Sequence, residues 1–214
     1  AFDSAGQRCS ALRVLCLQED VADRVLTMVK GAMHELRVGN TTRLVTDVGP
    51  VITAEAQQGI ESHVTRMANA GHRVSRLVLP NETAKGSFVA PTIIEIKSID
   101  ELKREVFGPV LHVVRYARED LEELIDAVNA TGYGLTFGLH TRLDDTIEQV
   151  TSRIKAGNIY VNRNTIGAVV GVQPFGGMGL SGTGPKAGGP SYLRRFAVEQ
   201  CVSTNTAAIG GNAS

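Results

Sequence analysis

The 214-residue sequence contains no tryptophan, and aromatic residues make up only 5% of it. So few stacking side chains argue against a surface that binds single-stranded nucleic acid. Lysine plus arginine and aspartate plus glutamate each number 22, so the formal net charge is zero. A chain without excess positive charge lacks the general attraction to phosphate on which DNA-binding proteins depend. DNA binding is therefore not supported by this sequence.

Cysteine and long apolar runs are scarce as well. The three cysteines, Cys9, Cys16 and Cys201, form no C-x-x-C pair and leave one thiol over in any disulfide scheme. Because the five histidines show no metal-ligand spacing either, we expect no metal site. No apolar run approaches the roughly 18 residues of a membrane span, and no signal-peptide pattern opens the chain. These features favour a cytoplasmic protein in a reducing compartment.

The composition is that of a globular protein with a proper core, since 43% of the residues are hydrophobic and 21% are charged. The length suits one large domain, or a domain with a small appendage. The chain starts at Ala1 rather than at a methionine and stops at Ser214 without a clear terminal signal. We therefore expect it to be a segment of a longer polypeptide.

Helical periodicity alternates with short β-rich runs along the chain. It predicts helices over 20–36, 53–70, 119–130 and 143–156, and strands over 74–79, 88–96, 110–116, 135–140 and 159–161. Thr53 and Gly71 have the character of residues that begin and end a helix, and Ser98 with Glu101 forms a capping-box pattern. Strands separated by helices of about 10 to 15 residues imply βαβ crossovers, and so an α/β fold with a parallel sheet.

Glycine dominates residues 162–190, where both periodicities stop. A stretch of this length without secondary structure is usually functional or disordered. Residues 177–182 match the dinucleotide-binding pattern G-x-G-x-x-G, with Glu199 farther along, but no strand directly precedes the match and no helix follows it. We therefore reject it as a cofactor fingerprint. Residues 191–206 resume an apolar-polar alternation that predicts a terminal strand.

Cys9 has the setting of a nucleophile. An isolated cysteine is most often a small buried hydrophobe, but Arg8 is a neighbouring cation and Ser10 is predicted to begin a helix. A helix N-terminus and a cation both favour the thiolate that a nucleophilic cysteine needs. Cys16 lies in an apolar run and is expected in the core, and Cys201 has no evident helper group. We therefore predict that Cys9 is the reactive thiol.

Glu105 and Phe107 stand together in the segment 105–110 (EVFGPV), directly before a predicted strand. One interpretation is a helix end followed by a Gly-Pro turn. The other is functional: a carboxylate accepts hydrogen bonds from a ribose while the ring packs against a planar cofactor. The segment by itself favours the first interpretation.

These segments together resemble the aldehyde dehydrogenase superfamily. The G-Q-x-C nucleophile motif, the E-x-F-G-P-V segment and the P-F-G-G-x-x-x-S-G loop occur in family order, and the resemblance covers nearly the whole chain. Residues 8–13, 173–177, 180–190 and the tail TAAIGGNA look like the L-glutamate-γ-semialdehyde (Δ1-pyrroline-5-carboxylate) dehydrogenase module of bifunctional proline utilization A proteins. The resemblance implies an aldehyde dehydrogenase catalytic domain over 1–190 with a parallel-type αβα sheet. An oligomerisation strand and the start of a C-terminal tail would occupy 191–214.

The resemblance also implies a mechanism. The Cys9 thiolate adds to the aldehyde carbon to give a thiohemiacetal, hydride passes to NAD⁺, and water hydrolyses the resulting thioester. The backbone N–H of Cys9 supplies an oxyanion donor. Glu105 binds the nicotinamide ribose, and Phe107 packs beside it.

Substrate choice would fall to the loop over 162–177. In the related enzymes a loop anchors the remote carboxylate of glutamate semialdehyde, and Gly167 and Ala168 match it here. Their backbone N–H groups would form an anion-binding nest. Ser10 would add a hydroxyl, and Phe175 would pack on the aliphatic part of the substrate. The alternative for this loop is a solvent-exposed connector.

The family's general-base glutamate, oxyanion asparagine and NAD-binding domain all precede the nucleophile. We therefore expect these residues alone neither to bind NAD strongly nor to turn over aldehyde. FAD is expected only in the proline dehydrogenase module of a bifunctional parent. Two alternatives stay open: a general or succinate-semialdehyde dehydrogenase, and a non-catalytic oligomerisation module. For each of these functions, residues 191–206 would add a strand to a neighbouring subunit of a homo-oligomer.

Overall fold

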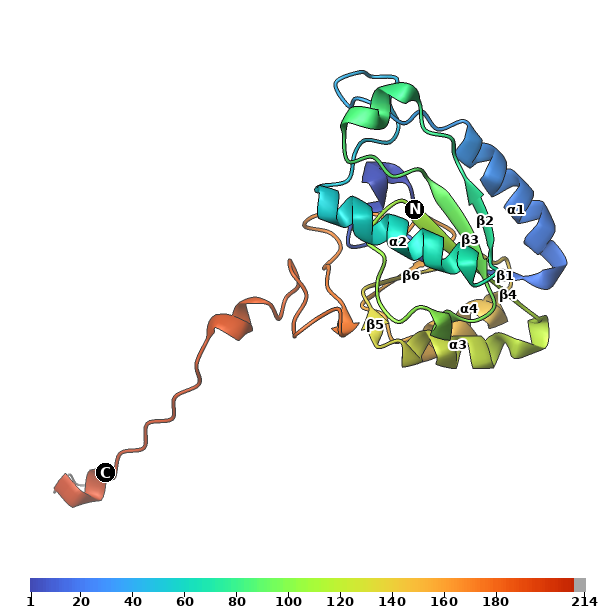
Figure 1. Ribbon diagram of the computed structural model, residues 1–214. Helices are drawn as coiled ribbons and strands as arrows, with labels where there is room; N and C mark the ends of the chain where they lie inside the picture. The colour runs from blue at the N-terminus through green and yellow to red at the C-terminus, as the bar shows by residue number, and fades with distance from the viewer. Residues whose placement is uncertain (210–214) are drawn as a thin grey trace.

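A four-stranded sheet in the order β1-β4-β3-β2 forms the centre of the computed structural model, which describes residues 1–209 (Figure 1). The strands are β1 (Val14–Gln18), β2 (Arg73–Arg76), β3 (Thr92–Ile96) and β4 (Val110–Tyr116). β4 runs parallel to both β1 and β3, whereas β2 joins β3 antiparallel. The predicted α/β fold is therefore confirmed, with a sheet that is mostly rather than wholly parallel.

Two helices cover opposite faces of this sheet; they are α1 (Glu19–His34) and α2 (Ala54–Asn69). Side chains alternate along a strand, so β4 supplies both cores. Leu111 and Val113 pack in the cluster that contains α1, and Val110 and Val114 pack in the cluster that contains α2. Both faces are buried, which explains why β4 reads as an almost continuous apolar run.

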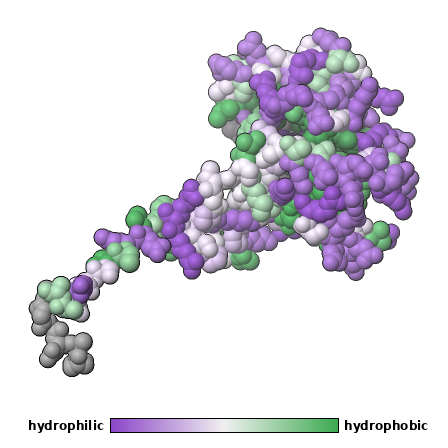
Figure 2. All heavy atoms as spheres, turned by 90° about the horizontal axis from the view of Figure 1, so that it is seen from below, coloured by the Kyte–Doolittle hydropathy of each residue, from purple (hydrophilic) through white to green (hydrophobic). Residues whose placement is uncertain are grey.

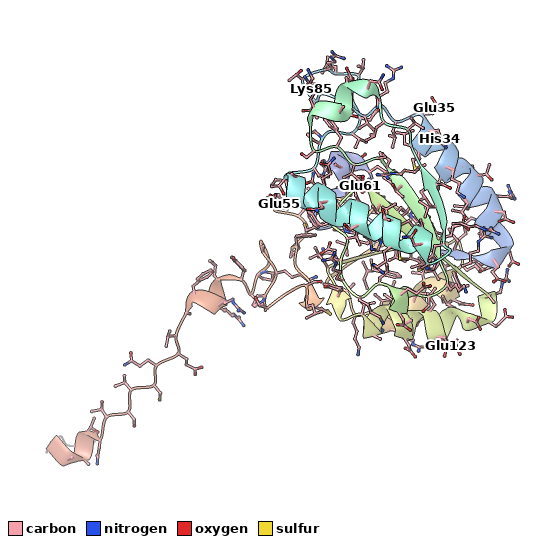
Figure 3. The ribbon with its side chains drawn as sticks, viewed as in Figure 1. His34, Glu35, Glu55, Glu61, Lys85 and Glu123 are labelled. Atoms are coloured by element: carbon pink, nitrogen blue, oxygen red, sulfur yellow. The ribbon has the colours of Figure 1, made fainter. Side chains whose placement is uncertain are left out.

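The predicted helix ends are confirmed. Thr53 Oγ1 accepts a hydrogen bond from the N–H of Ala56 at 3.1 Å, and Gly71 has a φ of 86° just beyond α2. Ser98 and Glu101 form the capping box around η3 (Ile99–Glu101). Glu55 lies at the start of α2 and Glu61 farther along it, where its carboxylate pairs with Arg76 of β2 (Figure 3).

A second unit follows β4. It contains α3 (Leu121–Ala130), β5 (Tyr133–Gly134), β6 (Thr136–Leu139), α4 (Asp144–Arg153) and β7 (Asn158–Val161). β6 and β7 pair in parallel with α4 as their crossover, and Ile125, Val150 and Ile154 form the core beneath. The predicted βαβ unit is thus present. Short 3-10 turns complete the chain: η1 (Asp3–Gly6), η2 (Asn81–Lys85), η4 (Arg118–Asp120), η5 (Leu193–Phe196) and η6 (Thr206–Ile209).

Close packing of backbone accounts for the glycines around β8 (Met178–Gly179), including Gly157, which packs against this segment from before β7. A Cβ at Gly157 would lie 1.7 Å from the carbonyl oxygen of Gly176, and one at Gly182 would lie 2.0 Å from that of Gly177. Within residues 162–190, β8 pairs antiparallel with β5. The next helical turn after Gly182 begins only at Leu193. The rejection of a dinucleotide-binding fingerprint is therefore confirmed.

The terminal strand predicted over 191–206 is not formed within this chain. Its start is the turn η5, and residues 197–205 are extended without a strand partner in the described part of the chain. Residues 191–209 form an arm that projects from the body (Figure 1). The arm carries exposed apolar side chains (Figure 2), among them Leu193, Phe196, Val198 and Val202. A strand needs a partner for its N–H and C=O groups. The end of the predicted tail, residues 210–214, lies outside the described residues.

No helix in residues 1–209 is both long and apolar enough to cross a membrane. Over the same residues, no three side chains of the metal-binding types gather closely enough to hold an ion.

A polar pair interrupts the core between α2 and the sheet. His63 of α2 and His112 of β4 are 3% and 2% exposed, and their Nε2 atoms lie 2.8 Å apart. Burial is the main cause that lowers the pKa of each imidazole from the ordinary 6.5 to about 4. Both rings are therefore neutral in the folded protein at neutral pH.

This burial predicts a pH-dependent stability. The unfolded histidines take up protons below pH 6.5 while the folded ones stay neutral down to about 4, so the free energy of unfolding falls as the pH is lowered through that window. Each histidine contributes a slope of up to about 1.4 kcal/mol per pH unit. Urea unfolding of the chain between pH 7 and 4.5 measures this slope.

The double variant His63→Gln/His112→Gln is the control and is expected to flatten the slope. Glu55, Glu95 and Glu101 also have a lowered pKa, but from an ordinary value of 4.5, so their effect is concentrated at the acidic end of this window and is shared by the wild type and the double variant. An unchanged slope in the double variant would contradict the assignment.

Candidate active site

Cys9 is exposed in a tight turn between η1 and β1. The N–H of Ala11 donates to the carbonyl of Arg8 at 3.1 Å, which closes the turn, and β1 begins at Val14. The predicted helix starting at Ser10 is therefore wrong, because the following apolar residues enter the sheet instead. The thiol stands on a turn and not at a helix N-terminus.

The turn is anchored on its N-terminal side. The side chain of Gln7 accepts from the N–H of Ile52 at 2.8 Å and donates to the carbonyl of Ser4 at 3.3 Å. Gly6 has a φ of +65°, and a Cβ there would lie 2.0 Å from the carbonyl oxygen of Gly108. Only glycine permits this approach, which presses the cysteine turn against the segment that leads into β4.

Arg13 ties the two segments together. Its guanidinium donates to the carbonyl of Gly6 at 2.6 Å, to the carbonyl of Arg8 at 3.1 Å and to the carboxylate of Glu105 at 3.0 Å. The Arg13 side chain is 18% exposed. A planar guanidinium with several donors suits such a junction of two carbonyls and a carboxylate. The sequence did not predict this role; its one signal is an isolated cation directly before an apolar run.

The same guanidinium brings Phe107 to the site. The Arg13 Cζ atom lies 4.6 Å from the centre of the Phe107 ring, a cation–π contact. Phe107 is 45% exposed, and the Glu105 side chain is 40% exposed. The predicted cofactor pair therefore lies beside the cysteine turn with a carboxylate and a ring open to solvent.

The loop over 162–177 reaches the site through Ser10. Ser10 is 5% exposed, and its carbonyl accepts from Thr165 Oγ1 at 3.1 Å. Two residues farther, Gly167 has a φ of +78° with open space around it. Within residues 1–209, no hydrogen bond to the chain uses the N–H of Gly167 or Ala168. These two donors remain available to a ligand.

Two asparagines, not foreseen as site residues, hold the ends of this loop. Asn162 directly follows β7 and has a φ of 55°; its side-chain oxygen accepts from the N–H of Thr141 at 3.0 Å, and its side-chain nitrogen donates to the carbonyl of Thr141 at 2.9 Å. Asn158 Nδ2 donates to the carbonyl of Pro174 at 3.0 Å, directly before Phe175. Phe175 is half-buried and forms a two-way backbone bridge with Ala187. The structure therefore fixes Phe175 near β7, at the far end of the loop from Thr165.

The other two thiols differ sharply from Cys9. Burial raises the pKa of Cys16 to about 12, so this thiol stays protonated in the core beside β4. Cys201 is exposed on the arm, outside the sheet body. The expectation that Cys16 is a core residue is confirmed.

Residues 1–202 match the family model for the aldehyde dehydrogenase family. The chain is 65% identical over 201 residues to the bifunctional protein PutA of Klebsiella aerogenes, which covers 92% of this chain. It is 39% identical over 197 residues to the 1-pyrroline-5-carboxylate dehydrogenase of Bacillus cereus, covering 90% of this chain.

Solved structures agree. A crystal structure of proline utilization A from Bradyrhizobium japonicum superposes with a TM-score of 0.89 at 58% identity, over 97% of this chain and 21% of that one. The 1-pyrroline-5-carboxylate dehydrogenase from Thermus with bound NAD gives a TM-score of 0.80 at 36% identity, over 92% of this chain and 37% of that one.

The chain spans 15% of the length of the Klebsiella relative and 37% of the Bacillus one. The resemblance carried by the three motifs is thereby confirmed for the family. This chain belongs to the aldehyde dehydrogenase family.

Proposed function

We propose that this chain is the cysteine-bearing catalytic segment of an NAD-dependent dehydrogenase that oxidises L-glutamate γ-semialdehyde to L-glutamate in proline catabolism. The observation that carries the proposal is the Arg13 clamp, which joins the turn of Cys9 to Glu105 and Phe107. The relatives support it through their names, which include bifunctional PutA and 1-pyrroline-5-carboxylate dehydrogenase.

Cys9 and the two residues held beside it by Arg13 suit the first chemical step. Cys9 is exposed, so its thiolate can reach an aldehyde carbon and form a thiohemiacetal. The Cys9 N–H would donate to the oxyanion that forms. Bound NAD⁺ would accept the hydride, which leaves a thioester on Cys9 for water to hydrolyse. Glu105 and Phe107 fit the ribose and the ring of the nicotinamide end, because both are partly exposed beside the turn.

The loop supports a substrate with a remote carboxylate. Gly167 and Ala168 offer two N–H groups shortly after Thr165, whose hydroxyl bonds the Ser10 carbonyl in the cysteine turn. Adjacent N–H groups of this kind bind anions. We assign Ser10 and Phe175 to the same substrate site, Ser10 by its hydroxyl and Phe175 by its ring.

The anchor predicts a selective effect of one methyl group. In the full-length enzyme, Gly167→Ala strains a backbone with φ +78°, which tilts both N–H donors. We expect the KM for glutamate semialdehyde to rise about tenfold, the value of one charge-assisted hydrogen bond. The KM for pentanal, which has no carboxylate, should not change. Steady-state NADH production measures both.

Gly171→Ala is the matched control, because Gly171 has a φ of +80°, open space around it and a place on the same loop. If the two substitutions raise the KM for glutamate semialdehyde equally, Gly167 and Ala168 do not anchor the substrate carboxylate. A wild-type preference for pentanal over glutamate semialdehyde would instead favour the general aldehyde dehydrogenase, and a preference for succinate semialdehyde would favour that alternative.

Thiol labelling separates an enzyme from a scaffold. With iodoacetamide under native conditions, we expect Cys9 to react far faster than Cys16, because Cys9 is exposed while burial raises the pKa of Cys16 to about 12. Cys201 on the arm provides the rate of a freely accessible thiol. Peptide mass mapping follows all three. A Cys9 rate near that of Cys16 would leave a non-catalytic oligomerisation module as the better explanation.

We further propose that residues 1–190 form the catalytic domain, and that 191–214 comprise an oligomerisation strand, over 191–206, and the start of a C-terminal tail. The strand would add to the sheet of a second copy of the chain. Strand β7 offers an acceptor, since it pairs only with β6 in the described residues and borders an open hollow of about 520 Å³. The exposed apolar side chains of the arm fit such docking. FAD would belong to a proline dehydrogenase module elsewhere in a bifunctional parent.

A further inference from the structure

Two buried histidines form a polar chain in the core between α2 and the sheet. His63 and His112 are 3% and 2% exposed. Their neighbours on this face of β4 are Val110 and Val114, which pack without any hydrogen-bonding demand. A buried polar group costs free energy unless all its hydrogen bonds are made. Core packing alone therefore gives no reason for imidazoles at these two positions.

The hydrogen bonds of the pair run in one direction. Arg66 Nη2, which only donates, lies 2.9 Å from His63 Nδ1, so this nitrogen accepts. A neutral imidazole has one donor and one acceptor, so His63 Nε2 carries the proton and donates to His112 Nε2 at 2.8 Å. His112 Nδ1 then donates to the carbonyl of Arg13 at 3.2 Å. The partners at both ends thus assign a single tautomer to each ring.

The surrounding charges keep this arrangement. The positive charges that act on the two rings are those of Arg13, Arg66 and Arg104, and His72 is a further titratable neighbour of His112. Their repulsion adds to the effect of burial, which by itself disfavours a charged imidazole. Both rings therefore remain neutral at neutral pH, and the tautomers persist there.

The chain of hydrogen bonds ends at the residue that clamps the cysteine turn. The carbonyl of Arg13 accepts from His112 twice, from the backbone N–H at 3.0 Å and from Nδ1 at 3.2 Å. The side chain of the same residue turns back to the carbonyls of Gly6 and Arg8. Two donors hold the peptide plane of Arg13, so the side chain that carries the guanidinium extends from a fixed backbone position.

We propose that His112 and His63 are positioning residues for the reaction of Cys9, and that they act by holding the Arg13 carbonyl through the donor at His112 Nδ1. This role rests on the proposed dehydrogenase function. His63 fixes the tautomer of His112, and His112 fixes Arg13. Neither ring touches the reacting atoms.

Amide side chains provide a crossed test. The amide nitrogen of asparagine takes the place of Nδ1, and that of glutamine takes the place of Nε2. His112→Asn therefore keeps the donor to Arg13, whereas His112→Gln loses it. At position 63 the order is reversed, because His63→Gln keeps the donor to His112 and His63→Asn loses it.

In the full-length enzyme that carries this chain, we expect His112→Gln to lower kcat about tenfold with an unchanged KM for NAD⁺, a loss typical of a misplaced nucleophile. His63→Asn should lower kcat by about threefold, since His112 keeps its ring beside the Arg13 carbonyl but is no longer held in one tautomer. His112→Asn and His63→Gln should stay near the wild-type value. The two positions would then tolerate opposite amides, which a packing role does not produce.

Equal losses in all four variants, or a wild-type kcat in His112→Gln, would overturn the proposal. Hydrogen exchange of the peptide over residues 6–13 gives a readout that needs no activity. Faster exchange only in His112→Gln and His63→Asn supports the positioning role of the two histidines, and uniform exchange across the four variants overturns it. If the wild-type enzyme oxidises no aldehyde, the proposed function fails, while the exchange data still show whether the two histidines position the turn of Cys9.

Discussion

The guanidinium of Arg13 is the interaction on which the site depends. It satisfies the carbonyls of Gly6 and Arg8, pairs with the carboxylate of Glu105 and covers the Phe107 ring, while only 18% of its side chain is exposed. A largely buried charge is stable only when its donors are used, and here two different segments use them. The turn that carries Cys9 therefore cannot move independently of the segment assigned to the cofactor.

The sheet topology explains why these segments meet. β1 and β4 are parallel neighbours, with Val14 opposite His112, so the residues that precede the two strands lie at one edge of the sheet. Arg13 precedes β1, and Glu105 to Gly108 precede β4. Open α/β sheets usually bind ligands at the carboxyl ends of their strands. In this domain the cysteine and its clamp stand at the amino ends instead, and the loop after β7 reaches them through Thr165.

Much of the fold was predictable because its long elements have clear periods. The strand 110–116 was predicted with the bounds that β4 has, and the bounds of α1 and α2 differ from prediction by one or two residues. β1 was missed because a short apolar run buried in a sheet has no period that separates strand from helix. The arm was predicted as a strand from its alternation, but alternation alone supplies no partner.

The candidate site divides in the same way. Motifs local in sequence pointed to Cys9, Glu105 and Phe107, and the structure brings these three together. Arg13 escaped prediction because its decisive contact joins residues 92 positions apart. The roles of His63 and His112 depend on which nitrogen faces which partner, and no sequence pattern contains that information.

The most direct test of this account is the kcat/KM of the full-length enzyme on glutamate semialdehyde after Arg13→Lys. Lysine keeps the charge but lacks the planar fork that serves two carbonyls and a carboxylate. We expect a loss of about a hundredfold, with Arg8→Lys as the control within about threefold, since among residues 1–209 the Arg8 side chain bonds only the hydroxyl of Ser4. An Arg13→Lys enzyme as active as the Arg8→Lys control would contradict the clamp.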